Sequence, residues 1–263
     1  MSDYRYIELE QADDCVTLWL NRPERHNALD ATLIAELHHA LDEVASRDTV
    51  RVVVLSGRGA SFCAGGDLEW MRAQATAPFE QNLLDARQLG FMLRALAGCP
   101  KPTVARVHGA ALGGGLGLVA ACDLVIASAS AQFGATETRL GLAPSSIAPY
   151  ISAAIGERAA RAWFLLGERL EAREALRLGL VHEVVEPEAL DAGLQRLLAT
   201  LRLGAPQAQQ HSKWLLEELR GLPSRSLEQG EECARSLASV RAGAEAQEGI
   251  EAFFAHRKPS WDR

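Results

Sequence analysis

The stretch that most constrains the fold is a run of three glycines, Gly113 to Gly115, between a strand-forming and a helix-forming segment. Residues 103–107 (TVARV) favour a buried strand, and residues 116–121 (LGLVAA) are small and apolar, with no proline. The first turn of a helix has unpaired N–H groups at the positive end of its dipole. Since glycine lets a ligand atom approach the backbone closely, we expect a strand, a tight turn and a buried helix whose first amides hold a partly negative atom.

A second turn of this kind follows the buried strand predicted at residues 51–55 (RVVVL). Residues 61–70 read SFCAGGDLEW, in which Asp67 and Glu69 lie where acidic residues favour the start of a helix. Taken alone, this glycine pair indicates a turn rather than a binding site.

The chain changes character along its length. Residues 1–150 alternate strand and helix patterns, which favours an α/β core with right-handed crossovers. Beyond Gly156 the pattern is mostly helical, over residues 157–166, 171–178, 187–202, 206–220 and 226–256.

Composition excludes several classes of function. Acidic residues outnumber basic ones, 34 to 27, and the net charge of −7 argues against nucleic-acid binding. Five scattered cysteines without a CxxC pair argue against a disulfide framework and against a metal site. No apolar run approaches the ~20 residues of a membrane span, and the N-terminus lacks a signal-peptide core, so we expect a cytoplasmic protein without membrane contact. Motifs for dinucleotide binding, a P-loop and a hydrolase serine are absent.

Several motifs in a fixed order resemble the crotonase superfamily, that is, the enoyl-CoA hydratase/isomerase family. They are NRP and NAL at residues 21–29, SFCAGGDL at 61–68, residues 108–123, residues 133–144, and the AREALRLGLV segment at 172–181. The resemblance covers residues 5–256. It implies a spiral of ββα units over residues 1–200, followed by a helical region at 201–263 that serves trimerisation or acts as a lid. A homotrimer or a dimer of trimers is the implied assembly.

The resemblance also implies the ligand and its site. The substrate would be an acyl-CoA thioester, with coenzyme A as part of the substrate and no separate cofactor. The backbone amides of Gly66 and Gly114 would form an oxyanion hole, and loss of one such donor typically costs roughly 10²–10³ in rate. The residues implied to contact CoA are Ala64, Asp67 and Leu68 along its chain and Arg22 and Arg25 at its phosphates.

The carboxylates depart from the family pattern. Typical hydratases of this family use two glutamates, and one of these positions matches Glu137 while the other is occupied by Gly117. Residues 144–150 (PSSIAPY) depart from the glycine-rich sequence that often follows in the family. One carboxylate can add water across a double bond or shuttle a proton along a bound enoyl chain, so both hydratase and isomerase stay open.

Finer similarity favours one substrate class. The segments GLGL after the glycine run, ETRLGLAP at 137–144 and AIGERAAR at 154–161 resemble bacterial methylglutaconyl-CoA hydratases of leucine breakdown and their relatives in terpene breakdown. Those substrates carry a second carboxylate, and we hypothesise that Gly117 makes room for a branched or carboxylated acyl chain. The alternatives are an enoyl-CoA Δ3,Δ2-isomerase, an acyl-CoA decarboxylase and a non-catalytic CoA-ester-binding protein.

Overall fold

The computed structural model describes residues 4–220 and 226–262. Backbone contacts divide the chain into two compact units. The first comprises residues 1–99 and 103–195, and the second comprises residues 100–102 and 196–263. The boundary falls within α8 (Leu190–Arg202). The two units are described separately.

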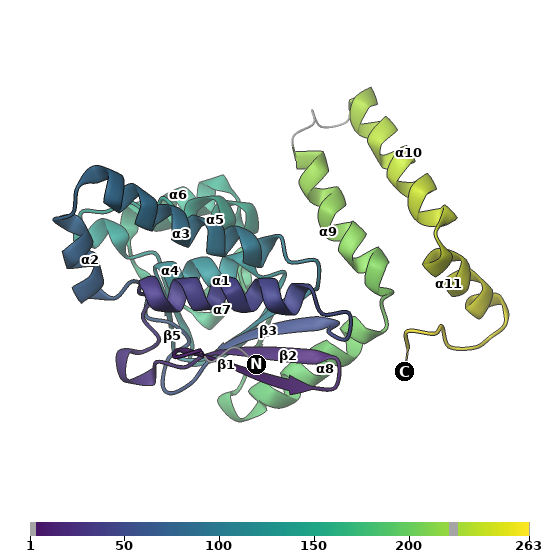
Figure 1. The fold of residues 1–263 in the computed structure, drawn as a ribbon, viewed down its shortest axis with the longest axis horizontal. Helices are drawn as coiled ribbons and strands as arrows, with labels where there is room; N and C mark the ends of the chain where they lie inside the picture. The colour runs from purple at the N-terminus through teal and green to yellow at the C-terminus, as the bar shows by residue number, and fades with distance from the viewer. Residues whose placement is uncertain (1–3, 221–225, 263) are drawn as a thin grey trace. The chain divides into compact units, whose positions relative to one another are not determined.

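A six-stranded sheet forms the centre of the first unit (Figure 1). Its strands, in spatial order, are β1 (Ile7–Ala12), β2 (Cys15–Leu20), β3 (Val52–Gly57), β4 (Thr103–Val107), β6 (Leu124–Ser128) and β9 (Glu183–Val185). β1 and β2 form an antiparallel hairpin, and every later pair is parallel. All six residues of β3 are buried, as expected for a central parallel strand with an uninterrupted apolar sequence.

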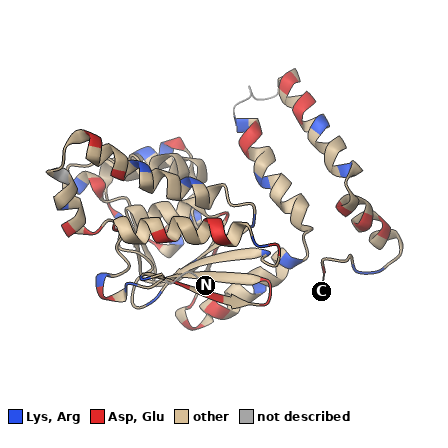
Figure 2. Cartoon of the chain, viewed as in Figure 1, with Lys and Arg blue, Asp and Glu red and all other residues tan. Residues whose placement is uncertain are grey.

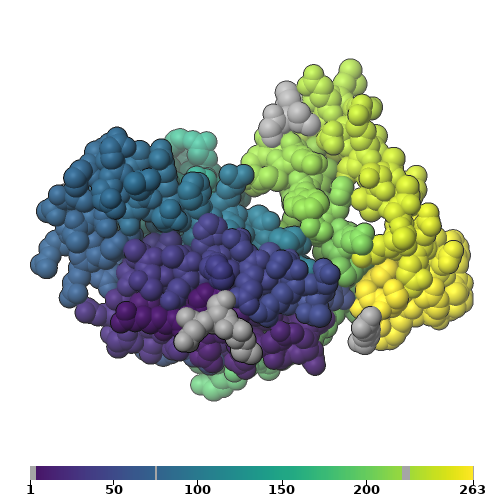
Figure 3. Space-filling model, in the orientation of Figure 1, coloured from purple at the N-terminus to yellow at the C-terminus, as the bar shows by residue number. Residues whose placement is uncertain are grey.

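Helix α1 (Ala31–Ala45) packs against β1 and β2 on one face of this sheet, and α3 (Phe79–Ala97) packs against α1 (Figure 1). The Asp30 side chain caps α1 by accepting a hydrogen bond from the Leu33 N–H at 2.8 Å. The buried side chains of α1 recur at helical spacing, which seals that face of the sheet: Leu33, Ile34, Leu37, Ala40, Leu41 and Val44. In the space-filling view, α1 and α3 form one continuous surface with the N-terminal strands (Figure 3).

A second sheet of three short strands carries the glycine run. It contains β5 (Ala110–Leu112), β7 (Gln132–Gly134) and β8 (Arg169–Glu171) in that order. β4, β5 and α4 (Gly114–Ala121) follow one another directly, as do β6 and β7 with the 3₁₀ turn η2 (Glu137–Leu140) and α5 (Ala148–Ile155). These repeated strand–strand–helix units confirm the expected α/β spiral.

The remaining helices of the first unit are short. They are the 3₁₀ turns η1 (Pro23–Arg25) and η3 (Pro187–Ala189), and the α-helices α2 (Leu68–Ala75), α6 (Glu157–Leu166) and α7 (Ala172–Leu178).

The second unit contains α9 (Pro206–Arg220), α10 (Leu227–Ala242) and α11 (Ala244–Phe254). The single helical pattern expected over residues 226–256 is therefore corrected to two helices. The break falls at Gly243, whose extended backbone (φ −72°, ψ 150°) ends α10 and begins α11. A cavity of about 600 Å³ is lined by residues of α9, α10, α11 and Trp261, and Figure 3 shows an opening between the green and yellow helices.

Two absences hold for the residues that the structure describes. None of their helices is long and apolar enough to cross a membrane. Across the same ranges, no group of three or more His, Cys, Asp or Glu side chains is arranged to hold a metal ion.

Candidate active site

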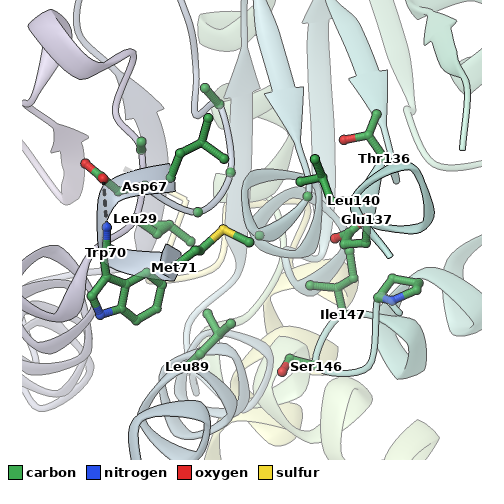
Figure 4. Close-up of a pocket in the computed structure, with 18 of the residues that line it drawn as sticks. Leu29, Asp67, Trp70, Met71, Leu89, Thr136, Glu137, Leu140, Ser146 and Ile147 are labelled. Atoms are coloured by element: carbon green, nitrogen blue, oxygen red, sulfur yellow. Dashed lines mark hydrogen bonds between the residues drawn. The ribbon is translucent and has the colours of Figure 1, made fainter. Parts of the chain in front are cut away.

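A cavity of about 720 Å³ in the first unit lies where the two glycine turns, α2 and η2 meet. Most of its wall is apolar, and Figure 4 shows Trp70, Met71 and Leu89 facing Glu137 and Ile147 across the opening. The expected turns at residues 65–66 and 113–115 thus lie at one site, although about 50 residues separate them in sequence.

The local backbone orients the Gly66 amide. Leu29 donates its N–H to the Gly65 carbonyl at 2.7 Å, and Asp67 donates its N–H to the Leu29 carbonyl at 2.8 Å. These two bonds make a short parallel bridge between Leu29 and Gly66. Because successive peptide groups of an extended segment point to opposite sides, the Gly66 N–H points away from Leu29. It donates to no acceptor among the described residues, and Gly66 lines the cavity.

The Gly114 amide is freed by a turn that requires glycine. Gly113 has φ +48° and ψ −121°, a conformation that side chains with a Cβ rarely adopt. Gly113 donates to the Gly134 carbonyl at 2.8 Å, and the first helical bond runs from Gly117 to the Gly113 carbonyl at 3.0 Å. Within the described ranges the Gly114 N–H therefore has no acceptor, and it lies at the positive end of α4.

Contacts between the two turns keep these amides close together. Leu112 donates its N–H to the Cys63 carbonyl at 3.0 Å, and Cys63 bridges Ala111 in parallel. A Cβ on Gly65 would lie 2.9 Å from the Leu112 carbonyl oxygen and 3.6 Å from Gly113 Cα, so the two turns pack backbone against backbone. The cavity therefore holds two unpaired amides on tightly joined turns.

Of the acidic residues that line the cavity (Glu24, Asp67, Glu69 and Glu137), Glu137 is the one with a carboxylate oxygen next to the Gly113 turn. It is the first residue of η2, lines the cavity and points inward from the wall opposite Met71 (Figure 4). Its Oε1 lies 3.3 Å from the point that a Cβ on Gly113 would occupy, which places it beside the second turn. Its Oε2 is buried without a hydrogen-bond partner among the described residues. Burial raises the pKa of this carboxyl above its ordinary value.

The expectation that Arg22 contacts a CoA phosphate is corrected by the structure. Its guanidinium is buried and pairs with Asp67 at 2.9 Å and with Asp30 at 3.2 Å, and it donates to the Ala28 carbonyl at 3.0 Å. Arg22 does not line the cavity. The expectation for Arg22 rested on its closeness in sequence to Arg25. The sequence of a basic loop does not show whether an arginine faces solvent or pairs with buried carboxylates.

Asp67 lines the cavity, and its side chain is held by bonds within the protein. Its carboxylate accepts hydrogen bonds from the N–H groups of Glu69 and Trp70 at 2.9 and 3.2 Å and so caps α2. Desolvation by burial, the largest single influence, raises the pKa of Asp67, but the N–H groups of Trp70 and Glu69 together with the Arg22 charge hold it below its ordinary value.

The other predicted CoA contacts do lie at the cavity. Ala64 and Leu68 line it, and the Leu68 side chain is exposed. Arg25 also lines it and is half exposed, with its nearest carboxylate, that of Glu69, 3.3 Å away. Arg25 is therefore available to a ligand phosphate in a way that Arg22 is not.

Gly117 does not open space for a ligand, contrary to the hypothesis drawn from the sequence. It is buried on α4 and does not line the cavity. A Cβ there would lie 2.3 Å from Ile147 Cγ2, so the Ile147 side chain already fills the space above Gly117. Sequence reasoning missed Ile147, Trp70 and Leu89 as lining residues, and the departure at residues 144–150 was the one signal that pointed towards Ile147.

The arrangement can stabilise an oxyanion and move a proton next to it. Two preorganised N–H donors suit an oxygen on which negative charge develops. A carboxylate whose pKa is raised by burial suits general acid–base chemistry.

Comparisons with known proteins agree with this chemistry. A family model described as "Enoyl-CoA hydratase/isomerase" matches residues 10–263. An (E)-benzylidenesuccinyl-CoA hydratase from Thauera aromatica is 35% identical, over 97% of this chain and 98% of that protein. A 1,2-epoxyphenylacetyl-CoA isomerase from Escherichia coli is 32% identical, over 94% of each chain.

Solved structures give the same result. An enoyl-CoA hydratase from Shewanella pealeana superposes with a TM-score of 0.93 at 37% identity, covering 98% of this chain and 96% of that one. AtuE from Pseudomonas aeruginosa superposes with a TM-score of 0.92 at 38% identity, covering 98% of this chain and all of that one.

Proposed function

Because the chain belongs to the enoyl-CoA hydratase/isomerase family, we propose that it is an enoyl-CoA hydratase with Glu137 as its general acid and base. The observation that carries the proposal is the Glu137 carboxylate, one oxygen of which is buried without a partner among the described residues, in one cavity with two unpaired amides. The family relationship supplies acyl-CoA thioesters as the substrate class.

In the proposed reaction the thioester oxygen accepts hydrogen bonds from the N–H groups of Gly66 and Gly114. Glu137 removes a proton from water as the water oxygen bonds to Cβ, and the electron pair of the double bond moves to give an enolate. The two amides stabilise the charge on the enolate oxygen. Glu137 then returns the proton to Cα, which completes the addition of water and regenerates the carboxylate.

For the acyl group we propose a branched or glutaconyl-type chain, such as that of 3-methylglutaconyl-CoA or a terpenoid analogue. The motifs at residues 115–118, 137–144 and 154–161 support this class. Likeness to a relative named for a benzylidenesuccinyl thioester adds support. A panel of crotonyl-CoA, 3-methylcrotonyl-CoA and 3-methylglutaconyl-CoA tests it, and a kcat/KM for crotonyl-CoA equal to or above the other two would contradict it.

A specific observation favours Δ3,Δ2-isomerase as the second candidate. The Glu137 carboxylate lies next to the Gly113 turn in the cavity, and a single base suffices to move a proton between two carbons of a bound enoyl chain. A relative named as an isomerase fits this reading.

Absorbance of the conjugated enoyl thioester separates the candidates. Loss of absorbance from crotonyl-CoA in water indicates hydration, whereas a gain from a 3-enoyl-CoA indicates isomerisation. Release of CO₂ from a carboxylated acyl-CoA would indicate a decarboxylase, and binding without any reaction would indicate a CoA-ester-binding protein. The Glu137→Gln variant is expected to abolish turnover and retain binding, and retained turnover would refute the role of Glu137.

We further propose that Arg25 contacts a CoA phosphate. Its exposure at the cavity supports this, since an arginine binds phosphate oxygens through charge-assisted hydrogen bonds. The expected result for Arg25→Met is a raised KM for acyl-CoA with kcat little changed. An unchanged KM would contradict the contact.

A further inference from the structure

The Ile147 side chain packs directly against the backbone of Gly117. A Cβ at position 117 would lie 2.3 Å from Ile147 Cγ2 and 3.0 Å from Ile147 Cβ, so only glycine leaves room for this isoleucine. Leu93 Cδ2 lies 3.6 Å from the same point and belongs to the same buried cluster as Ile147. Ile147 is also the N-cap residue of α5, and its N–H donates to the Pro144 carbonyl at 3.2 Å. Its side chain is thus wedged between α4, α3 and the start of α5.

A small part of the Ile147 side chain reaches the cavity. Ile147 is only 2% exposed, yet it lines the cavity next to Glu137 (Figure 4). Behind it lies the backbone of α4 at Gly117, which the cavity does not reach. The Ile147 side chain therefore forms the wall at which the cavity ends on this side.

The direction of a bound substrate follows from the two ends of the cavity. With the thioester oxygen at Gly66 and Gly114, the CoA portion extends towards Arg25 and His26, which line the cavity at the η1 turn. The acyl chain must then run past Glu137, towards Ile147 and Leu89.

From this geometry we infer that Ile147 is a specificity-determining residue that limits how far the acyl chain can extend beyond Cβ. The inference rests on the proposed function and deepens it, since it assigns the substrate class to short acyl chains. An acyl chain that is branched near Cβ fits in front of the Ile147 side chain, whereas a long linear acyl chain would meet the methyl groups of Ile147. A close-packed wall does not yield to an extra methylene without strain.

The test compares Ile147→Ala with Ile151→Ala. Ile151 lies one helical turn further on in α5 and is equally buried, but it does not line the cavity, so it controls for lost packing. We expect Ile147→Ala to raise the ratio of kcat/KM for 2-octenoyl-CoA to that for crotonyl-CoA by about 10-fold or more, since one methylene in an apolar pocket is worth roughly 10–200-fold. Ile151→Ala should leave that ratio unchanged. An unchanged ratio in Ile147→Ala, or an equal rise in both variants, overturns the inference.

A rescue experiment tests the packing of Ile147 against Gly117 directly. Gly117→Ala alone should lower activity and melting temperature, because its Cβ meets Ile147 Cγ2. The double variant Gly117→Ala with Ile147→Ala should recover both relative to Gly117→Ala, and a further loss would contradict the fit. If the unaltered protein transforms neither these two thioesters nor 3-methylcrotonyl-CoA and 3-methylglutaconyl-CoA, the proposed function fails. If it is active but the ratio does not move, only the role of Ile147 fails.

Discussion

At the residue scale, Glu137 lies in a buried environment that disfavours the negatively charged form of its carboxyl group. One carboxylate oxygen is buried without a partner, and burial raises the pKa of the group. An acid whose pKa is higher in the folded than in the unfolded state stabilises the fold when protonated, and this stability is lost as pH rises through the folded pKa. At pH 7 the unaltered protein therefore bears the cost of an ionised, poorly solvated carboxylate.

We accordingly expect Glu137→Gln to melt at a higher temperature than the unaltered protein at pH 7, although it loses activity. The difference should shrink towards pH 4, where Glu137 becomes protonated in both folded and unfolded chains. Thermal unfolding at both pH values measures this. If the two melting temperatures are equal at pH 7, or if they differ more at pH 4, burial of the ionised Glu137 carboxylate does not destabilise the fold.

Arg22 and Arg25 make a matched pair with opposite expected effects. Removing Arg22 leaves the buried Asp67 without its cation at 2.9 Å and Asp30 without its cation at 3.2 Å. Breaking a buried pair on one side typically costs about 3–5 kcal/mol, so Arg22→Met should lose that much free energy of unfolding in a urea titration. Arg25→Met removes an exposed pair and should cost less than about 1 kcal/mol. Equal losses in the two variants would contradict the assignment of Arg22 to the fold.

The sequence was informative about single residues where a motif fixes the backbone as well as the side chain. Gly66, Gly114 and Glu137 lie together at the cavity because each belongs to a turn whose shape its neighbours dictate. Arg22 and Gly117 were misjudged because their surroundings come from distant parts of the chain. Asp67 takes the guanidinium of Arg22, and Ile147 fills the space over Gly117. Neither partner can be found from spacing along one segment.

At the scale of elements, the turn before α4 positions the Gly114 amide and should not tolerate a side chain. Gly113 has φ +48°, and a Cβ there would approach Glu137 Oε1 to 3.3 Å. Gly113→Ala should therefore displace both the amide and the carboxylate and lower kcat by roughly 10²–10³, the usual cost of losing one oxyanion donor. Gly141→Ala is a matched control, since Gly141 also has a positive φ, +74°, but a Cβ there meets nothing within 4 Å. A similar loss of kcat in both variants would indicate backbone strain rather than loss of the donor.

Long elements were predictable and short ones were not. The buried strands at residues 52–57 and 103–107 have nearly continuous apolar sequences, and the helix capped by Asp30 has apolar residues at helical spacing. β5 and β7 have only three residues each. Their pairing with each other is tertiary, so no local pattern reveals it. The break at Gly243 was missed because the apolar pattern continues across it.

At the scale of the whole molecule, we expect self-association through the second unit. Its helices expose large apolar side chains, among them Phe253 and Phe254, each 76% exposed. Figure 2 shows both acidic and basic side chains on α9 and α10, whereas the charged residues of α11, which carries Phe253 and Phe254, are all acidic. Exposed apolar groups gathered on one part of a protein indicate an interaction surface. A homotrimer is the assembly that the family relationship favours.

The prediction is that the purified protein has three or six times its chain mass of 28.4 kDa in light scattering coupled to size-exclusion chromatography. Phe253→Asp places a charge within the proposed interface and should shift the mass towards a single chain, because desolvating an unpaired charge is costly. Phe79→Asp is the matched control, since Phe79 is 75% exposed but lies on α3 in the first unit, and it should leave the mass unchanged. A single-chain mass for the unaltered protein would contradict the assembly. A Phe253→Asp variant that keeps the full mass would instead show that the contact between copies lies elsewhere.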